Sequence, residues 1–408
     1  MNSPVKVIFI NHYYYPDISA TSQLLTSLSK YLSGQDFEVH IVTSRQTYTD
    51  PEICLPKSAQ LDGIHIHRLW TTRYGRQRLW GRLIDYMTFY SSMAWRLMLL
   101  TKAHDILVAK TDPPLVSVVV AVISSLKRAR LVNWLQDLFP EVACALDVKG
   151  SRYFAPILKT MRNRSLKAAE CNVVIGANMA KVLHAEGIPK DRIKVIHNWA
   201  DGDVIKPLAN QRNKLRVKWG LHDKFVIGYS GNMGRAHEFN TIVEAAERLR
   251  DDPRILFLFV GSGSQREFIE KEKRSRLLNN IEVKAYQPVK LLSEILTVPD
   301  IHLVSLKKSL EGLIVPSKLY GILAAGRPLI FLGDTHGETA SIIDYARCGF
   351  SIASEDVDMM VLYILQLQRS PILCRKMGGR ARLAHDSDYG KSQALSRWKA
   401  LLEDCVAH

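Results

Sequence analysis

The 408-residue sequence has few cysteines and no closely spaced pair among them. The six cysteines are spread along the chain, and none forms the C-x-x-C spacing that is typical of zinc sites and redox-active disulfides. Disulfide scaffolds are short, secreted chains with a much higher density of cysteine. We therefore expect reduced thiols and no zinc site.

Long apolar runs are also missing. The longest run covers residues 115–126, whereas a membrane-spanning helix needs about 20 apolar residues. The first residues lack the basic region, long apolar core and cleavage site of a signal peptide. We expect a cytoplasmic protein in which residues 115–126 are buried inside the fold.

The charge is strongly unbalanced, with 55 Lys and Arg against 40 Asp and Glu and a net charge of +15. Such a field favours nucleic acid, an anionic membrane surface or anionic substrates. The basic residues are spread over the chain, and no helix-turn-helix, zinc or RNA-binding motif is present. We expect no nucleic-acid partner, although a basic nucleic-acid-binding protein remains the alternative from another functional class.

One basic segment, residues 71–100, is rich in aromatic residues. It predicts an amphipathic helix, and two interpretations stay open for it. The helix either contacts an anionic membrane surface, or packs on the core with an arginine-rich face toward solvent. The arginines concerned are Arg73, Arg76, Arg78 and Arg82, and the aromatic residues are Trp80, Tyr86, Phe89, Tyr90 and Trp95.

Short apolar strands alternate with helical patterns along both halves of the chain. The first half opens with strands at 5–15 and 37–44, and the pattern restarts at 225–234 after a polar linker. This alternation predicts an α/β fold with two doubly wound, Rossmann-like domains built on parallel sheets. We place a first domain at 1–203, a second at 204–385, and a C-terminal helix at 386–408 that packs back toward the first domain.

Two glycine-bearing loops in the second half follow strands and precede helices. They are S-G-N-M-G at 230–234 and G-S-G-S at 261–264. In this position backbone N–H groups can receive a phosphate. The full G-x-G-x-x-G spacing is absent, so each loop is either a phosphate-binding loop or a tight strand-to-helix turn.

A longer segment is more specific. Residues 309–331 read SLEGLIVPSKLYGILAAGRPLIF, and they occur together with GYSGNMG, VGSG, VIHNWAD and, near the N-terminus, HYYYPDISATSQLLTSLSKYL and QDLFPE. This set of motifs resembles the family 4 retaining glycosyltransferases of GT-B fold. Within that family it is most similar to the bacterial enzymes that assemble O-antigen, capsule and exopolysaccharide repeats.

The resemblance implies two facing Rossmann-like domains and transfer with retention of configuration. It implies a hexosyl- or N-acetylhexosaminyl-type transferase. The donor would be a nucleotide diphosphate sugar, with a UDP-sugar as the first candidate, bound mainly by the second domain. The acceptor would be a glycan or a lipid-linked glycan on the first domain. Enzymes of this group work on lipid-linked acceptors, so we expect peripheral contact with an anionic membrane at the inner face of the cytoplasmic membrane. The alternative within enzymes is a sugar-nucleotide epimerase of the same fold.

The resemblance also assigns candidate residues, with some departures. Aligned on A-A-G-R-P, Gly321 stands where the family has the glutamate that holds the donor ribose, and Glu311 lies two residues before the other expected glutamate. New negative charge on the leaving diphosphate requires fixed cations and amides. The candidate catalytic residues are Asp137 and Glu311, and the candidate donor and phosphate residues are Ser19, Ala20, Thr21, Ser230, Gly231, Asn232, Arg235, Gly261, Pro316, Ser317 and Lys318.

A D-S-D string at 386–388 imitates the metal-binding D-x-D motif of another glycosyltransferase fold. It lies between two helical patterns and does not follow a central strand, so we interpret it as a polar turn at a helix start. We expect no metal ligands and no cofactor, because protein cations and helix termini can neutralise the diphosphate.

Overall fold

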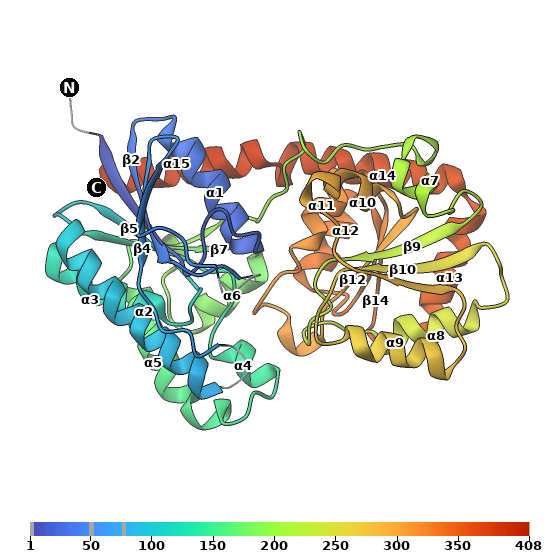
Figure 1. The fold of residues 1–408 in the computed structure, drawn as a ribbon, viewed down its shortest axis with the longest axis horizontal. Coiled ribbons are helices and arrows are strands. Elements are labelled where there is room, and N and C mark those ends of the chain that lie inside the picture. Colours follow the sequence, from blue (N-terminus) through green and yellow to red (C-terminus); the bar gives the residue numbers. More distant parts are fainter. Residues whose placement is uncertain (1–3, 49–52, 76–78, 408) are drawn as a thin grey trace. The chain divides into compact units, whose positions relative to one another are not determined.

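The computed structural model describes residues 4–48, 53–75 and 79–407, and it divides into two compact units (Figure 1). The first unit comprises residues 1–197 and 395–408, and the second comprises residues 198–394. Each unit is an α/β structure with its own central sheet. The chain therefore enters the second unit after His197 and returns to the first at Leu395.

The first unit contains an eight-stranded sheet in the order β3-β4-β2-β1-β5-β6-β7-β8. All neighbouring strands are parallel except β3 and β4, which form an antiparallel hairpin. The sheet is therefore parallel, as expected, apart from this antiparallel hairpin at its edge. The strands are β1 Val5–Ile10, β2 Phe37–Ser44, β3 Ser58–Leu61, β4 Ile64–Leu69, β5 Ile106–Lys110, β6 Arg130–Trp134, β7 Cys171–Val174 and β8 Ile193–Val195.

Helices α2, α3 and α5 pack side by side in the first unit (Figure 1). In α2 the buried Phe89, Met93 and Leu97 recur every four residues and pack in the same apolar cluster as strand residues Leu107 and Ala109. Among the described residues, no helix is long and apolar enough to cross a membrane. The helices of this unit are α1 Ala20–Ser33, α2 Leu79–Leu100, α3 Val116–Lys127, α4 Glu141–Ala145, α5 Ser151–Ala168 and α6 Ala177–Ala185.

Two expectations for this helix layer need correction. Val122 and Leu126 of α3 are exposed, so residues 115–126 are not buried throughout. Arg82 is exposed near the start of α2, Arg73 lies before the helix, and Arg76 and Arg78 fall outside the described residues. Among the described residues, the outward face of α2 is therefore not the arginine-rich solvent face that the second interpretation predicted.

The second unit contains a six-stranded parallel sheet in the order β11-β10-β9-β12-β13-β14. Its apolar core lies between the sheet and the helices α8, α9 and α13. The strands are β9 Phe225–Ser230, β10 Ile255–Val260, β11 Ile281–Lys284, β12 Ile301–Ser305, β13 Leu329–Leu332 and β14 Gly349–Ile352. The helices are α7 Lys214–Lys218, α8 Asn240–Arg248, α9 Arg266–Ser275, α10 Leu292–Thr297, α11 Lys318–Ala324, α12 Glu338–Ala346, α13 Val357–Arg369 and α14 Pro371–Ala384.

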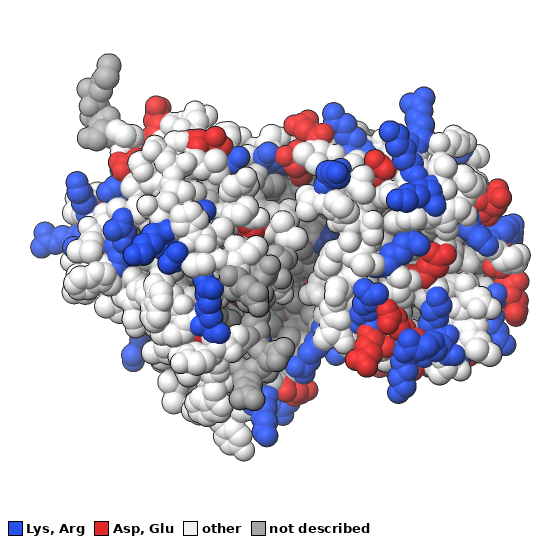
Figure 2. All heavy atoms as spheres, viewed as in Figure 1, with Lys and Arg blue, Asp and Glu red and all other residues white. Residues whose placement is uncertain are grey.

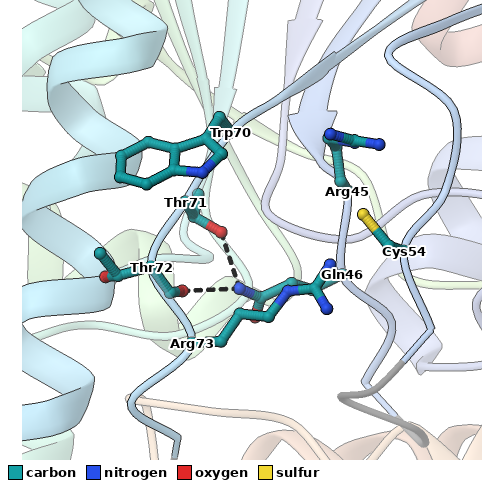
Figure 3. Close-up of a pocket in the computed structure, with 7 residues that line it drawn as sticks. All are labelled: Arg45, Gln46, Cys54, Trp70, Thr71, Thr72 and Arg73. Carbon is teal, nitrogen blue, oxygen red and sulfur yellow. Dashed lines mark hydrogen bonds between the residues drawn. The ribbon is translucent and has the colours of Figure 1, made fainter.

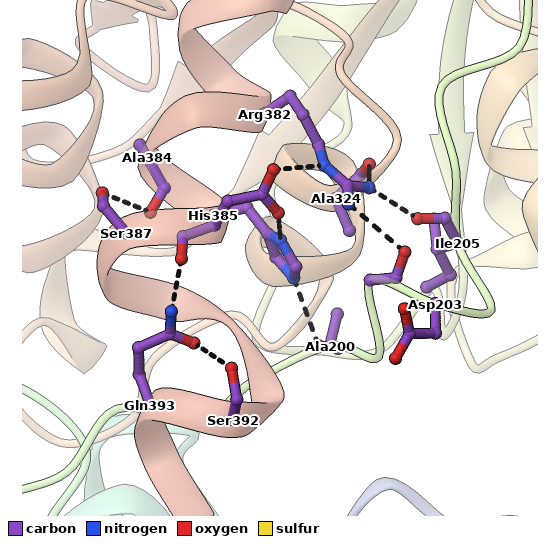
Figure 4. A network of polar contacts seen from close by, with 12 residues as sticks. Ala200, Asp203, Ile205, Ala324, Arg382, Ala384, His385, Ser387, Ser392 and Gln393 are labelled. Atoms are coloured by element: carbon purple, nitrogen blue, oxygen red, sulfur yellow. Dashed lines mark hydrogen bonds and ion pairs between the residues drawn. The ribbon is translucent and has the colours of Figure 1, made fainter.

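The D-S-D string does not form the expected turn. Residues His385–Tyr389 form one π-helical turn that joins α14 to α15, which spans Lys391–Ala407. Arg382 Nε donates to Asp386 Oδ2 at 2.8 Å, and its guanidinium also donates to the carbonyls of Ile205 and Ala324 (Figure 4). Among the described residues, no group of three or more His, Cys, Asp and Glu is arranged to hold a metal ion. Asp386 therefore serves a structural ion pair.

The last residues belong to the first unit. Trp398 of α15 is fully buried, and its ring lies 4.6 Å from that of Trp134 at the end of β6. Arg130 at the start of β6 also donates to the carbonyl of Cys405. The end of α15 is thus anchored on one strand by a tilted indole pair and a hydrogen bond.

Candidate active site

The strand order of the second unit reverses direction between β9 and β12. Successive strands run from β9 toward β11 on one side and from β12 toward β14 on the other. Ligands of open α/β sheets bind outside the carboxyl ends of the strands at such a reversal. The segments that follow β9, β10 and β12 carry most of the donor residues expected from the sequence.

The two glycine loops are joined to each other backbone to backbone. Gly231 has φ +121° and Gly261 has φ +145°, and a Cβ on Gly261 would lie 2.1 Å from the carbonyl oxygen of Gly231. The N–H of Met233 donates to the carbonyl of Ser262 at 2.8 Å. Glycine is required here because one loop packs directly on the other. This contact explains the glycines without a bound phosphate, so the tight-turn interpretation has a structural basis for both loops.

Lys318 is the first residue of α11, and its ammonium group turns toward the loop after β9. Lys318 Nζ donates to Tyr229 Oη at 2.6 Å and to the carbonyl of Asn232 at 3.0 Å. It also lies 3.0 Å from His237 Nε2 and 4.3 Å from the centroid of the Tyr229 ring. Lys318 is thereby fixed against the loop that joins β9 to α8.

The protonation state of His237 follows from its two contacts. His237 Nδ1 lies 2.5 Å from the carbonyl oxygen of Ser305, which can only accept, so Nδ1 carries the proton. Nε2 is then the acceptor that faces Lys318. Burial, together with the positive charge of Lys318, lowers the pKa of His237 to about 3. His237 is therefore neutral at physiological pH.

Lys318 has acceptors but no counter-ion. Its hydrogen-bond partners are a phenol, a carbonyl and a neutral imidazole, and no carboxylate of the described part of the chain forms an ion pair with it. Burial lowers the pKa of Lys318 from 10.5 to about 7. An anion placed beside this ammonium group would restore its charge and gain a charge-assisted hydrogen bond. The arrangement is suited to binding a phosphate group.

The remaining donor candidates of the second unit lie around this position. Asn232 and Arg235 are exposed on the loop after β9, and Ser230 Oγ is buried with no hydrogen-bond partner among the described residues. Ser317 precedes α11 without a side-chain capping hydrogen bond, and the carbonyl of Pro316 accepts from the N–H of Leu319. The structure thus gathers these candidates on two segments that Lys318 joins, while their roles toward a donor stay predictions.

Glu311 has a structural contact that the sequence did not indicate. Its Oε1 accepts from the N–H of Glu338 at 2.8 Å, at the first residue of α12. A carboxylate at this position satisfies an unpaired backbone donor and is favoured by the helix dipole. The predicted catalytic role of Glu311 therefore has to coexist with a capping role.

In the first unit, Ser19, Ala20 and Thr21 lie at the start of α1. Ser19 is the N-cap residue, yet its side chain caps no backbone N–H and its Oγ is buried with no partner among the described residues. The carbonyl of Thr21 accepts from Lys110 Nζ at 3.2 Å, and that ammonium lies over the ring of Trp134. The buried Lys110 thus fixes the first turn of α1, whose N–H groups are suited to an anion.

Asp137 follows β6 in the same unit, and its environment suits it to accept a proton. Its Oδ1 is buried and has no hydrogen-bond partner among the described residues. Burial raises its pKa to about 6, against a smaller lowering by the hydroxyl of Thr111. The carboxylate is therefore mostly ionised at neutral pH and can take up a proton just below it.

A cavity of about 320 Å³ opens beside the ends of β2 and β4 in the first unit (Figure 3). Gln46 forms one wall, where its Nε2 donates at 2.7 Å to both Thr71 Oγ1 and the carbonyl of Thr72. The cavity combines two guanidinium groups with the exposed indole of Trp70. Its lining residues are Arg45, Gln46, Cys54, Trp70, Thr71, Thr72 and Arg73.

Sequence reasoning missed Tyr229 and His237 as members of the site. Tyr229 reads as an ordinary strand residue, and His237 stands where the resembled family has a lysine. The replacement of that lysine by a histidine was the available signal, because a neutral imidazole can accept a hydrogen bond from an ammonium group and position it. Of the cavity residues in the first unit, Thr71, Thr72 and Arg73 belong to the basic aromatic segment 71–100, but that pattern did not indicate a cavity.

Comparison with known proteins identifies the family of this chain. Residues 21–199 match the glycosyl transferase 4-like domain, and residues 211–384 match the family described as glycosyl transferases group 1. The chain belongs to the family 4-like glycosyltransferases. The two matches fall on the first and second units respectively, so both halves of this glycosyltransferase have family counterparts.

Individual relatives agree with this assignment. The glycosyltransferase is 24% identical over 386 residues to WcaI of Escherichia coli (strain K12), named as a colanic acid biosynthesis glycosyl transferase, with 89% of this chain and 92% of WcaI covered. It is 22% identical over 304 residues to the glycosyltransferase WbjE of Pseudomonas aeruginosa, with 74% and 75% covered. Anabaena HepE, solved with UDP and glucose, superposes with a TM-score of 0.73 at 13% identity, covering 98% of this chain and 100% of HepE. The last likeness shows a shared GT-B fold.

Proposed function

We propose that this glycosyltransferase moves a hexosyl or N-acetylhexosaminyl group from a UDP-sugar to a lipid-linked glycan in the synthesis of a bacterial surface polysaccharide such as O-antigen or capsule. The observation that carries the proposal is Lys318, a half-buried ammonium group held by three neutral acceptors with no carboxylate partner. A leaving diphosphate would supply the missing negative charge. The complex of HepE with UDP and the name of WcaI support the donor and the pathway class.

The proposed roles follow from chemistry. Lys318 and Arg235 would neutralise charge that develops on the diphosphate as the glycosidic bond breaks. Glu311, which caps α12 through Oε1, would accept from donor sugar hydroxyls. Asp137 would serve in the first unit, and the first turn of α1 from Ser19 to Thr21 would approach the phosphates. Retention of configuration, and the absence of a metal requirement, belong to the same proposal.

We assign the acceptor to the cavity of the first unit. Arg45 and Arg73 can pair with phosphate oxygens, and the exposed face of Trp70 can stack on a sugar ring. Arg45→Gln with Arg73→Gln should raise the acceptor KM at least about fivefold and leave the affinity for UDP unchanged. An unchanged acceptor KM would remove the cavity from the reaction.

The donor site is tested by transfer assays with a panel of UDP-sugars and a lipid diphosphate glycan acceptor. Lys318→Ala and Arg235→Ala should each lower kcat/KM by at least about tenfold, since each removes a cation from the leaving group. Lys376→Ala and Arg375→Ala are matched controls, because both side chains are exposed on α14. Near-normal turnover in both site variants would exclude this phosphate site.

The epimerase alternative gives a different product. A sugar-nucleotide epimerase would convert the donor without an acceptor, whereas a transferase releases UDP only as the acceptor is glycosylated. The basic nucleic-acid-binding alternative is not favoured by the charge distribution on the face in Figure 2, where lysines and arginines are scattered over both units and do not gather into one stripe.

A further inference from the structure

Helix α2 is apolar on two opposite sides. Its core side is buried, and a second stripe of apolar side chains follows the spacing of three and four residues on the outward side. The stripe consists of Trp80, Ile84, Met87, Trp95 and Met98, and Trp80 and Trp95 are 78% and 71% exposed. A helix that is apolar on both sides is typical of one covered on both sides. Among the described residues of its unit, only one side of α2 is covered.

The neighbouring helices extend this surface. Helix α5 exposes Tyr153, Phe154 and Ile157 in its first two turns, and α3 exposes Val122 and Leu126. Helices α2 and α5 both pack against α3 (Figure 1). Soluble monomers rarely leave so many large apolar side chains in one layer, and such layers mark interaction surfaces.

The charges of the same helices have one sign. The sequences of α2, α3 and α5 contain a single acidic residue, Asp85. Asp85 is buried and accepts from Thr72 Oγ1 at 2.6 Å, so it contributes little to the surface. Exposed cations stand near the ends of the helices, with Arg82 near the start of α2, Arg128 directly after α3 and Arg164 in the last turns of α5. An apolar surface bordered by cations complements the headgroups and acyl chains of an anionic bilayer.

We infer that the outward face of α2, α3 and α5 docks this glycosyltransferase on an anionic phospholipid bilayer, with its tryptophan, phenylalanine and aliphatic side chains inserted among the headgroups. The inference rests on the proposed lipid-linked acceptor for its purpose, though not for its evidence. It replaces electrostatic contact by the arginines of residues 73–82 with shallow apolar insertion assisted by charge. Salt should therefore weaken the binding without abolishing it.

The docked face is tied to the acceptor cavity through α2. Ser92 Oγ donates to the carbonyl of Trp70 at 2.9 Å, and Thr72 is held by Asp85 and by the hydroxyl of Thr88. One wall of the cavity is thus fastened to the helix whose outward side carries the apolar stripe. A bilayer bound to that stripe would lie close to the place where the lipid diphosphate is expected.

Vesicle co-sedimentation of the full chain tests the inference. Trp95→Gln with Phe154→Gln should lower partitioning onto vesicles of phosphatidylglycerol and phosphatidylethanolamine at least about tenfold, since two large side chains lose their burial. Leu362→Gln with Leu383→Gln is the matched control, because these side chains are 54% and 70% exposed in the second unit. The control should bind within about twofold of the parent, and phosphatidylcholine vesicles should bind all three proteins more weakly.

Tryptophan quenching and a transfer assay complete the test. Brominated acyl chains should quench the parent's tryptophan fluorescence and quench Trp80→Phe with Trp95→Phe less. Transfer to a short soluble acceptor should be unchanged in the Trp95→Gln with Phe154→Gln variant (the Gln pair). If the parent protein shows no transfer, the proposed function fails, while the vesicle-binding result still stands. Equal vesicle binding by the Gln pair and the parent would overturn the inference. So would a lipid-free dimer of the parent that dissociates in the Gln pair, since the face would then bind a second copy.

Discussion

At the scale of single residues, the chemistry of the second unit depends on whether Lys318 carries its charge. The side chain sits among neutral acceptors, and burial lowers its pKa to about 7. His237, with a pKa near 3, does not titrate in the same range. A change in activity around neutral pH can therefore be attributed to Lys318 by substitution.

We predict that kcat/KM for the donor falls as pH rises through about 7, because the free enzyme then loses the ammonium form of Lys318. Lys318→Arg should retain activity above pH 8, since a guanidinium stays protonated there. A donor titration from pH 6 to 9 on parent and variant measures this. A parent profile that is flat over this range, or one that Lys318→Arg leaves unmoved, would show that another group governs the pH dependence.

Glu311 gives a second prediction at this scale, because one carboxylate is assigned both a cap and a substrate contact. Glu311→Ala should lower the free energy of unfolding by about 1 kcal/mol, the usual cost of losing a helix cap. Glu311→Gln keeps an acceptor oxygen and should melt near the parent, while its kcat falls. Equal melting temperatures for both variants would argue against the cap, and parent-like kcat in the Gln variant would confine Glu311 to structure.

At the scale of elements, the two glycine loops determine the shape of the proposed phosphate site. Gly261→Ala would place a Cβ 2.1 Å from the Gly231 carbonyl at a φ of +145°. We expect a loss of at least about 2 kcal/mol in stability, since the obstacle is backbone and the conformation is strained. Urea unfolding measures it.

Gly379 is the matched control for that substitution. It lies within α14 with nothing within 4 Å of an added Cβ, so Gly379→Ala should raise stability by about 0.5–1 kcal/mol. If Gly261→Ala proves as stable as Gly379→Ala, the loops do not pack as described.

The sequence predicted most helices and strands correctly, whereas it did not predict which of their faces are exposed. The alternation of strands and helices in both halves predicted the α/β architecture, because apolar periodicity reports local burial. The β3–β4 hairpin was missed although Asp62-Gly63, both at positive φ, is a strong hairpin turn. The partners of Lys318 come from segments about 80 residues away in sequence, and no local pattern reports such contacts. The outward apolar stripe of α2 could not be predicted, because the core side of the helix is equally apolar and the sequence does not show which side is buried.

At the scale of the whole molecule, the proposed reaction divides between two units that each have a family counterpart. The donor side relies on Lys318, Arg235 and the loops of the second unit, and the acceptor side relies on the cavity of the first. Variants in one unit should therefore alter kinetic parameters for one substrate.

We predict that transfer survives EDTA, because the diphosphate charge is assigned to protein cations and Asp386 is engaged by Arg382. The test compares steady-state rates in about 5 to 10 mM EDTA with rates in the presence of added Mg²⁺. Activity that disappears with the chelator and returns with a divalent ion would transfer the neutralising role to a metal.

The central claim is that Lys318 binds the donor diphosphate, and isothermal titration calorimetry with UDP and uridine tests it most directly. The parent should bind UDP at least about tenfold more tightly than uridine, and Lys318→Ala should lose most of that preference, since a charge-assisted hydrogen bond contributes about 1.5–3 kcal/mol. Lys376→Ala should match the parent. A Lys318→Ala variant that keeps the full preference for UDP over uridine would contradict the claim.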